Sequence, residues 1–577
     1  MSLRNKFLAS VGALALGATA MSMAPIAQAA TPASWSGPAP AVKGAVTGGT
    51  LTILNQGDFE HIDPARNYVG GTLDFYRFFI RTLTQYRTIN GKTELVPDVA
   101  ADLGTTPDNG KTWTFKLRPN LKYEDGSKIT CQDLKYGTMR SYNDEILDGG
   151  TTYAEDFLQN ETGFKGPYTD PTGDLTSIIC SPKGDAITYK LAYAVPYFAY
   201  VTTFGSFSPV PKAKDTKQNY DLRPVSSGPY KIESYNRGKN MTLIRNKNWD
   251  PKSDPLRWNY PDKIVVKFGY EQNALENMLF SDSGEAKRAM SLDTQMVTNL
   301  AEALTYSPLF KDRLYAFDSP YARYLAINMD TVTDINVRKA IQCAVNLETV
   351  LLAAGGTNAG MYANSLIPTS LKNAYRNFNV CGRDVHKSPE GQTDAAKALL
   401  AKSPNAKKDL ILAYRDKGTE PARAAAVQQA LIAAGFKVTM MKLPRAGYYT
   451  RIGQRDVGVV QPDVIQTSWG FDWAAASGIV PALLDGRTMS PTDSHSNYSR
   501  QNEPSMQSLF EKADMITDPV KSDKALGDLE QKIVVDFAGV VPMYIEASTF
   551  MTGSKLGGVQ ADGGYGTLSP LAAFVRK

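Results

Sequence analysis

A strand–helix–strand unit constrains the fold of this chain more than any other stretch. The sequence predicts a strand over 409–414 and another over 436–441, with a helix over 419–434 between them. Pro421 suits the first turn of that helix, and Gly435 suits its end. Because a crossover of this kind is right-handed and joins parallel strands, the unit predicts an α/β sheet.

Residues 1–29 have the pattern of an export signal. Arg4 and Lys6 precede an alanine-rich apolar run over 8–23, and small residues stand where a signal peptidase reads the chain. The run is short for a membrane span and is interrupted by Ser and Gly, so we expect cleavage after Ala29 rather than a membrane anchor. The mature protein should be exported and soluble.

The stretch after the expected cleavage site bears on location. Residues 30–47 are rich in Pro, Ala and Ser, which predicts a flexible N-terminal segment. No Cys stands near the cleavage site to carry a lipid. We therefore expect a periplasmic, extracellular or cell-envelope-associated protein without a lipid-attachment site.

The composition favours a large globular protein with a small-molecule partner. Hydrophobic residues make up 42% of the 577 residues, which suffices for two or three ordinary cores. The formal net charge is +5, and removal of the two positive charges of the signal, Arg4 and Lys6, leaves +3. So balanced a chain argues against nucleic acid as a partner.

Residues 227–250 predict a β-hairpin and carry the first family signature. Strands are expected over 230–235 and 241–245, with Gly238 supplying the turn. The stretch opens with Ser227-Gly-Pro-Tyr and closes with Arg-Asn-x-x-Trp249. This pattern resembles the family 5 solute-binding proteins of ABC importers, which capture peptides or similar small solutes outside the membrane.

Further stretches resemble that family, in the family's own order. A strand over 50–54 leads to an Asp-Pro loop, two helices have capping residues at their starts, and a late strand returns the chain to its first lobe. Apolar residues at helix-like intervals also predict a helix over 72–84. The Asp-Pro loop is at Asp63-Pro64, and the helix caps are Thr130 with Asp133 and Asp334, which follows a strand over 323–328. The returning strand covers 540–545.

The resemblance implies a periplasmic-binding-protein-like α/β fold with two lobes, of class C, and an additional inserted small domain. Two crossings between the lobes would form a hinge, so that ligand closes a cleft. It also implies membrane permease subunits as partners, no cofactor and a monomer. The implied division is lobe one at 48–91, 221–321 and 537–577, the inserted domain at 92–220, and lobe two at 322–536.

Four cysteines in an exported chain favour disulfides over a metal site, because no close Cys-x-x-Cys spacing occurs. Three pairings are possible, and four buried free thiols are the alternative. Sequence neighbours fall within the same implied lobe, so we expect Cys131 to pair with Cys180 and Cys343 with Cys381. Each bond would contribute about 3 to 4 kcal/mol in the loop-entropy model.

Asp472, in Thr467-Ser-Trp-Gly-Phe-Asp-Trp473, is the leading candidate for ligand binding. Family members that bind peptides hold the α-ammonium with an aspartate three residues after a tryptophan, here Trp469. A carboxylate in a closed, dry cleft needs a cationic partner, and a peptide N-terminus supplies one. Backbone groups of Ser468, Gly470 and Phe471 would extend recognition by adding the peptide as a strand.

Local chemistry offers Asp472 another role, which is to cap a helix predicted over 473–484. Trp469 and Trp473 suit either apolar pocket walls or core packing. Tyr153 resembles a cleft-facing tyrosine of the inserted domain. Asn67 and Tyr68, which follow the Asp63-Pro64 loop, occupy another cleft-lining region of the family.

An enzyme is the rival class, since an exported protein of this size could be a hydrolase. The chain has 3 histidines, His61, His386 and His495, and no His-Glu-x-x-His motif, so no metal site is predicted. Gly-x-Ser-x-Gly and the phosphate-binding Gly-x-x-x-x-Gly-Lys-Ser/Thr loop are also absent. We expect no catalytic residues. Within the binding class, an oligosaccharide or a metal chelate is the alternative ligand.

Overall fold

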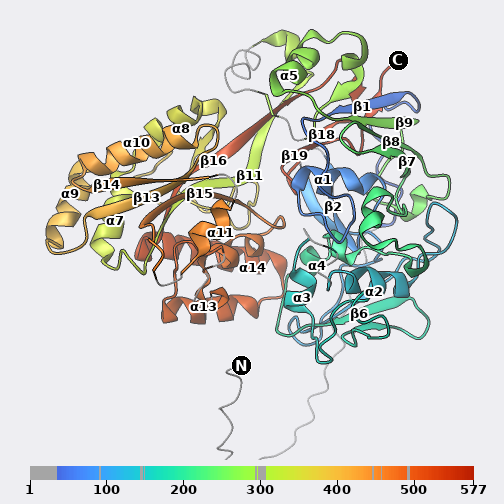
Figure 1. Ribbon diagram of the computed structural model, residues 1–577, viewed down its shortest axis with the longest axis horizontal. Coiled ribbons are helices and arrows are strands. Elements are labelled where there is room, and N and C mark those ends of the chain that lie inside the picture. The colour runs from blue at the N-terminus through green and yellow to red at the C-terminus, as the bar shows by residue number, and fades with distance from the viewer. Residues whose placement is uncertain are drawn as a thin grey trace, which may run out of the picture.

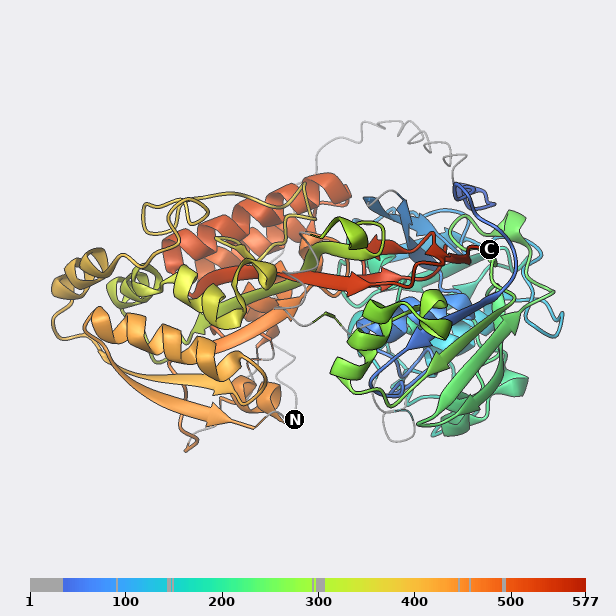
Figure 2. The same cartoon turned by 90° about the horizontal axis from the view of Figure 1, so that it is seen from above.

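The computed structural model describes two lobes joined by two long strands (Figures 1 and 2). The predicted export signal over 1–29 lies outside the described residues. The described residues are 35–89, 92–142, 147, 150–292, 295–296, 307–444, 447–455, 458–489, 494 and 496–577.

Lobe one is built on a five-stranded sheet in the order β10-β1-β9-β8-β7. β1 pairs in parallel with β9 and β10, and the predicted hairpin is confirmed as antiparallel β7 and β8 with Gly238 at φ +72°. The strands are β1 Thr50–Leu54, β7 Tyr230–Asn236, β8 Asn240–Arg245, β9 Lys263–Lys267 and β10 Ala289–Met290.

Shorter elements complete lobe one. They are helices α1 Gly70–Phe75 and α5 Gln272–Ser281, the hairpin of β2 Thr84–Ile89 with β3 Lys92–Pro97, and four short strands near the C-terminus. Those strands pair as β17 Leu556–Gly557 with β20 Phe574–Val575, and as β18 Gln560–Asp562 with β19 Thr567–Ser569.

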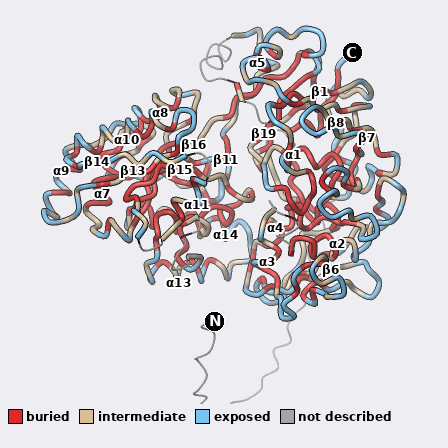
Figure 3. The backbone as a smooth tube through the Cα atoms, in the orientation of Figure 1, coloured by how far each residue is buried: buried red, intermediate tan, exposed pale blue. Residues whose placement is uncertain are grey.

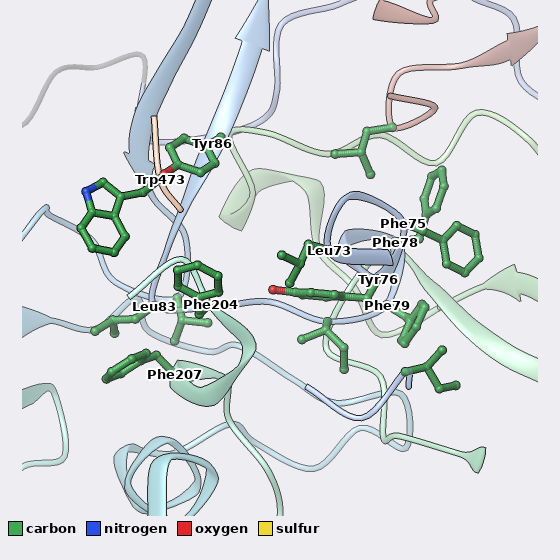
Figure 4. Packing of buried hydrophobic residues seen from close by; sticks show 14 of the residues in the cluster. Leu73, Phe75, Tyr76, Phe78, Phe79, Leu83, Tyr86, Phe204, Phe207 and Trp473 are labelled. Atoms are coloured by element: carbon green, nitrogen blue, oxygen red, sulfur yellow. The ribbon is translucent and has the colours of Figure 1, made fainter. Parts of the chain in front are cut away.

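The helix predicted over 72–84 is wrong in its second half. The helix ends at Phe75 and is followed by a short 3-10 turn, Tyr76–Phe78. The carbonyl of Phe79 then accepts hydrogen bonds from the backbone N–H groups of Ser227 and Gly228, at 2.8 and 3.0 Å. The aromatic side chains are buried on all sides rather than along one helical face (Figure 4), so tertiary packing sets the backbone path here.

The inserted unit holds a three-stranded antiparallel sheet in the order β4-β6-β5. Its principal helix, α2, begins with the predicted capping box, in which Thr130 and Asp133 satisfy each other's backbone N–H groups. The Cys131–Cys180 bond ties this helix to β5 and confirms the expected pairing. The elements are β4 Thr112–Lys116, β5 Ile178–Cys180, β6 Ala186–Lys190, α2 Cys131–Met139, α3 Tyr153–Phe157 and α4 Phe198–Val201.

Lobe two is built on a six-stranded mixed sheet in the order β12-β16-β11-β15-β13-β14. The predicted strand–helix–strand unit is confirmed, since β13 Asp409–Arg415 runs parallel to β14 Lys437–Leu443 with α10 Glu420–Ala433 between them. The remaining strands are β11 Leu314–Ile327, β12 Gly360–Tyr362, β15 Val464–Gly470 and β16 Val540–Met551.

Helices cover this sheet, and each lobe has its own buried interior (Figure 3). Asp334 caps α7 as predicted, accepting hydrogen bonds from the N–H groups of Asn336 and Val337. The expected bond between Cys343, on α7, and Cys381 is present. The helices are α7 Ile335–Ala344, α8 Leu347–Ala354, α9 Thr393–Lys402, α11 Tyr448–Gly453, α12 Val480–Leu484, α13 Pro504–Asp514 and α14 Pro519–Lys532.

β11 and β16 are neighbours in the sheet of lobe two and continue into lobe one (Figure 2). The expected boundary between residues 321 and 322 falls inside β11, and that between 536 and 537 falls just before β16. Their register shifts between Asp318 and Ala322. A bulge bends a strand and increases its twist, so the shared ladder is interrupted where the chain passes between lobes.

Of residues 30–47, expected to be flexible, 30–34 lie outside the described residues, and 35–47 lie against lobe one and the inserted unit. Arg118 donates to the carbonyl of Trp35 at 2.6 Å, and the indole of Trp258 donates to the carbonyl of Pro40 at 2.9 Å. Ala39 is buried. Proline-rich backbone has carbonyls free to accept hydrogen bonds, and Trp258 of lobe one and Arg118 of the inserted unit hold the segment through them.

Candidate functional site

The inter-lobe site begins where β15 ends. Gly470 closes the strand opposite Tyr321 of β11. A Cβ atom at Gly470 would lie 2.9 Å from the Tyr321 ring, so only glycine lets this ring cover the strand end. The chain then turns away from the sheet toward lobe one.

The three residues that follow the strand, Phe471 to Trp473, place their side chains in three different environments. Phe471 packs into the core of lobe two and is 7% exposed. Trp473 packs into the core shared by lobe one and the inserted unit and is 3% exposed, although its backbone belongs to lobe two (Figure 4). Asp472 stands between them, half-buried at the contact of the two lobes.

Hydrogen bonds hold the loop after β15 in place. The N–H of Asp472 donates to the carbonyl of Gly478 at 2.9 Å, and the indole of Trp473 donates to Ser477 Oγ at 2.9 Å. The N–H of Ala476 donates to Asp523 Oδ1 of α14 at 2.8 Å. The carboxylate of Asp472 is therefore presented by a fixed backbone.

The helix predicted over 473–484 is wrong in its first half, and with it the capping role of Asp472. A 3-10 turn occupies Ala476–Gly478, and α12 starts at Val480 with Ile479 as its N-cap. Because the loop carbonyls and Asp523 already satisfy the backbone, no helix begins at Trp473. The side chain of Asp472 is left for another partner.

Lobe one presents Tyr68 to this carboxylate from a braced loop. Arg140 binds both oxygens of Asp63, at 2.9 and 2.7 Å, and Asp63 Oδ1 accepts from the N–H of Ala65 at 2.9 Å. Both partners of the ion pair are fully buried. The Asp63-Pro64 loop is thus fixed where it meets the inserted unit, and Tyr68 extends from its end.

Two tyrosine hydroxyls meet Asp472. Tyr68 donates a hydrogen bond to Asp472 Oδ1 across the lobe contact. Burial raises the pKa of Asp472 to about 6, and hydrogen bonds from Tyr68 and Tyr153 partly oppose that rise. Burial and the nearby Asp472 carboxylate raise the pKa of Tyr153 well above its ordinary value, so the hydroxyl stays protonated as a donor.

Within the described part of the chain, Asp472 forms no ion pair with a basic side chain. A partly buried carboxylate without a counter-charge is unfavourable for the ligand-free protein. The arrangement suits an external cation that hydrogen-bonds to the carboxylate when the lobes close.

The other predicted site residues divide between the site and the cores. Ser468 is buried on the same face of the sheet as Arg323, its partner on β11. Trp469 packs against the core of lobe two, and its indole N–H has no hydrogen-bond partner in the described structure. Asn67 is buried, its Oδ1 accepts from the N–H of Val69 at 3.1 Å, and its amide nitrogen lacks a described partner.

Several aromatic residues of the site were missed from the sequence. Tyr197 stacks on Trp473 at 5.2 Å, Phe204 lies 5.2 Å from the Tyr153 ring, and the Tyr86 hydroxyl accepts from the N–H of Ala474 at 3.1 Å. Their sequence surroundings are apolar and indicate only a core. No motif distinguishes them, because their role depends on a partner from the other lobe.

No metal centre or membrane span emerges from the residues that the structure describes. They contain no cluster of three or more His, Cys, Asp or Glu side chains placed to hold a metal ion. None of their helices combines the length and the apolar character that crossing a membrane requires.

Two α/β lobes joined by paired strands, with a carboxylate at their contact, define the class of two-lobed solute-binding proteins. The model of the bacterial extracellular solute-binding proteins, family 5, matches residues 94–490, more than half of the chain, and the chain belongs to this family.

Similar proteins extend over most of the chain. The periplasmic murein peptide-binding protein MppA of Escherichia coli is 23% identical over 476 residues, 79% of this chain and 80% of that protein. The dipeptide-binding protein DppE of Bacillus subtilis is 23% identical over 480 residues, 80% of this chain and 81% of that protein. Both have names that specify a peptide ligand.

Solved structures share the fold. The structure titled clavulanic acid biosynthesis oligopeptide binding protein 2 superimposes with a TM-score of 0.84 at 24% identity, covering 92% of this chain and 96% of its own. The unliganded open form of MppA has a TM-score of 0.73 at 20% identity, covering 92% of this chain and 99% of its own.

Proposed function

We propose that this protein is the exported receptor of an ABC importer and captures oligopeptides between its lobes. The observation that carries the proposal is Asp472, a shielded carboxylate at the lobe contact whose described hydrogen-bond partners are tyrosine hydroxyls. A peptide α-ammonium supplies the missing charge and several donors. The ligand would displace the hydroxyl of Tyr68 or share the carboxylate with it.

The end of β15 extends the same recognition. β13 pairs with β15 only at Val464 and Ile465, so the far part of β15 has a free edge on that side. A peptide lying beside Ser468 to Phe471 would exchange main-chain hydrogen bonds with this edge, which selects a peptide backbone rather than a sequence. No chemistry is required of the protein, and membrane permease subunits would receive the ligand.

The proposal places the first 29 residues in a cleaved export signal and the folded chain outside the cytoplasm. The relative MppA is named as a periplasmic protein, which supports this location. Edman sequencing of protein secreted by its native host is expected to begin at Ala30. A mature chain that retains residues 1–29 would contradict the assignment.

Calorimetry with a pool of short peptides, free and N-acetylated, tests the ligand. Asp472→Asn is expected to weaken binding by about 2 to 5 kcal/mol, because the buried ammonium loses its counter-charge. Acetylation of the peptides should weaken their binding to the wild type by a similar amount. The variant should bind acetylated and free peptides equally well, since the mutation and the acetylation remove the same contact. Asp536→Asn, a half-exposed acid on the far side of lobe two, is the matched control.

Two outcomes would overturn the peptide assignment. Equal affinity for free and acetylated peptides would show that no α-ammonium is recognised. Recovery of sugars or chelates, rather than peptides, from protein purified from its host and denatured for mass spectrometry would assign the cleft to another solute.

A further inference from the structure

A second cavity lies at the lobe contact, behind the loop that carries Asp472. Its volume is about 990 Å³, and its walls come from lobe one, the inserted unit and lobe two. Asp472 and the two tyrosines that meet it, Tyr68 and Tyr153, do not line it. The Trp473 ring lies between this cavity and the ammonium site, since it stacks on Tyr197 of the cavity at 5.2 Å and meets Tyr153 of the ammonium site edge-on at 5.5 Å.

The cavity is of the size and character of a small-molecule site. Ligand pockets of about 300 to 1,000 Å³ are typical for drug-sized molecules. Aromatic rings of Trp113, Tyr197 and Tyr200 form the side contributed by the inserted unit, and Leu371 and Ile516 face them from lobe two. Aromatic faces attract cations as well as apolar groups.

One shielded carboxylate lines this cavity. Asp523 is 9% exposed, and its Oδ1 accepts a hydrogen bond from the N–H of Ala476 at 2.8 Å. It forms no ion pair with a basic side chain among the residues described. Tyr200 lines the same cavity from the inserted unit, and burial together with the nearby charge of Asp523 raises the pKa of its hydroxyl to about 12.

The other charged side chains of the cavity do not neutralise Asp523. Glu94 is paired with Arg87 at 2.6 Å, and Lys372 is exposed to solvent. Burial raises the pKa of Asp523 itself to about 6, with the N–H of Ala476 opposing the rise. The cavity therefore combines aromatic walls with a single shielded acid.

We propose that this cavity binds an organic cation with an apolar body, separate from the ligand held by Asp472. The cation would face Asp523, and the apolar body would lie against Trp113, Tyr197 and Tyr200. Because both lobes supply walls, the cation would bind only when the lobes are together. It would therefore tighten binding at the ammonium site, and the ligand there would tighten binding of the cation by the same factor.

The test compares 2-phenylethylamine with its neutral analogue 2-phenylethanol, by titration calorimetry at pH 7.5. The amine is expected to bind at least about tenfold more tightly than the alcohol. Asp523→Asn should abolish this preference while keeping an acceptor oxygen for the N–H of Ala476. Asp472→Asn should leave the preference in place. An amine that shows no saturable binding at millimolar concentration, or whose binding depends on Asp472 instead, would overturn the proposal.

A surface variant provides a test that does not touch buried groups. Val520 lines the cavity yet is 56% exposed, so Val520→Arg should fold and should weaken amine binding through repulsion of like charges. Leu352→Arg, at a 72% exposed position of α8 that does not line the cavity, adds the same charge as a control. Equal amine affinities in the two variants would contradict the assignment.

Discussion

At the scale of single residues, the proposed site centres on Asp472, a carboxylate whose cationic partner would come from the ligand. The pKa of Asp472 is raised from 3.8 to about 6 because burial penalises the ionised form more than two hydroxyls stabilise it. Ligand binding and folding therefore depend on pH through the same group, but with opposite sign.

Peptide binding should weaken as the pH falls. A peptide α-ammonium is mostly protonated below its ordinary pKa of about 8, so within this ion pair the acid is the group that mainly changes state between about pH 7.5 and 5. At pH 5 about nine-tenths of Asp472 would be protonated, and affinity should fall about tenfold. Calorimetry at the two pH values measures this, and Asp472→Asn should remove the pH dependence. The same slope in the variant would assign it to another group.

The ligand-free protein should respond in the opposite direction. Below about pH 4, Asp472 is protonated in the folded and unfolded states and has no effect on stability. As the pH rises from about 4 to 6 the unfolded state ionises first, so the folded state loses stability, and the loss is complete above pH 6. In thermal unfolding, the Tm of Asp472→Asn relative to wild type should rise across this window. A constant difference would be inconsistent with the raised pKa.

Tyr68→Phe isolates the hydrogen bond across the lobes. The hydroxyl of Tyr68 lowers the pKa of Asp472, so its removal should move the midpoint of the pH-dependent binding above 6. The midpoint is read from affinities measured at half-unit steps of pH. Tyr321→Phe is the matched control, because its ring also lies at the strand end without a hydrogen bond to the carboxylate in the described structure. Identical shifts in both variants would exclude a specific role for Tyr68.

At the scale of elements, short sequence motifs correctly predicted the helix caps and the hairpin turn that depend on neighbouring residues alone. Thr130 and Asp133 cap α2, Asp334 caps α7, and Gly238 turns the hairpin, because each motif satisfies backbone groups within a few residues. The helix expected after Trp473 failed for the converse reason. Its backbone is satisfied by Asp523, which is distant in the sequence.

The site was predictable only in part. Asp472 and Trp473 stand in a recognisable motif, and the resemblance to the family singles out Tyr68 and Tyr153 as expected cleft residues. That the Tyr68 hydroxyl meets the Asp472 carboxylate could not be read from spacing, because 404 residues separate the two. Trp469 illustrates the limit, since a tryptophan beside a strand end suits core and pocket equally, and here it contacts the core of lobe two.

The disulfide bond between α2 and β5 should contribute several kcal/mol to the free energy of unfolding. The Cys131–Cys180 bond closes a loop of 49 residues, and replacement of both cysteines by alanine should lower the free energy of unfolding by about 3 to 4 kcal/mol. Urea denaturation followed by circular dichroism measures the loss. Ligand affinity should stay unchanged, because neither cysteine lines the site. A variant of equal stability would show that the helix is held by packing alone.

At the scale of the whole molecule, Trp473 acts as a contact between lobes. Its backbone belongs to lobe two, and its ring lies in the core shared by lobe one and the inserted unit, where it meets Tyr153 and Tyr197 of the inserted unit. Burial of so large a side chain favours the closed arrangement even without ligand. Removal of the ring should therefore open the protein rather than unfold either lobe.

Trp473→Ala tests this expectation. The ligand-free variant should have a larger radius of gyration in small-angle X-ray scattering and weaker ligand binding, because part of the binding energy is then used to close the lobes. Loss of a buried tryptophan typically costs about 3 to 5 kcal/mol, which bounds the effect. Trp258→Ala, which removes a partly exposed tryptophan within lobe one, should change neither quantity. An unchanged radius for Trp473→Ala would show that the ring does not control closure.

The two strands that connect the lobes have a mechanical consequence. β11 and β16 are hydrogen-bonded to each other, and their ladder is interrupted between Asp318 and Ala322. Two separate loops would permit sliding, rocking and rotation, whereas a paired ribbon resists shear and yields mainly by twisting at its interruption. Relative motion of the lobes should therefore be mainly a change of the angle between them at this interruption. In the proposed role, a permease that contacts both lobes would detect a bound ligand through this angle, whatever the chemical nature of the ligand.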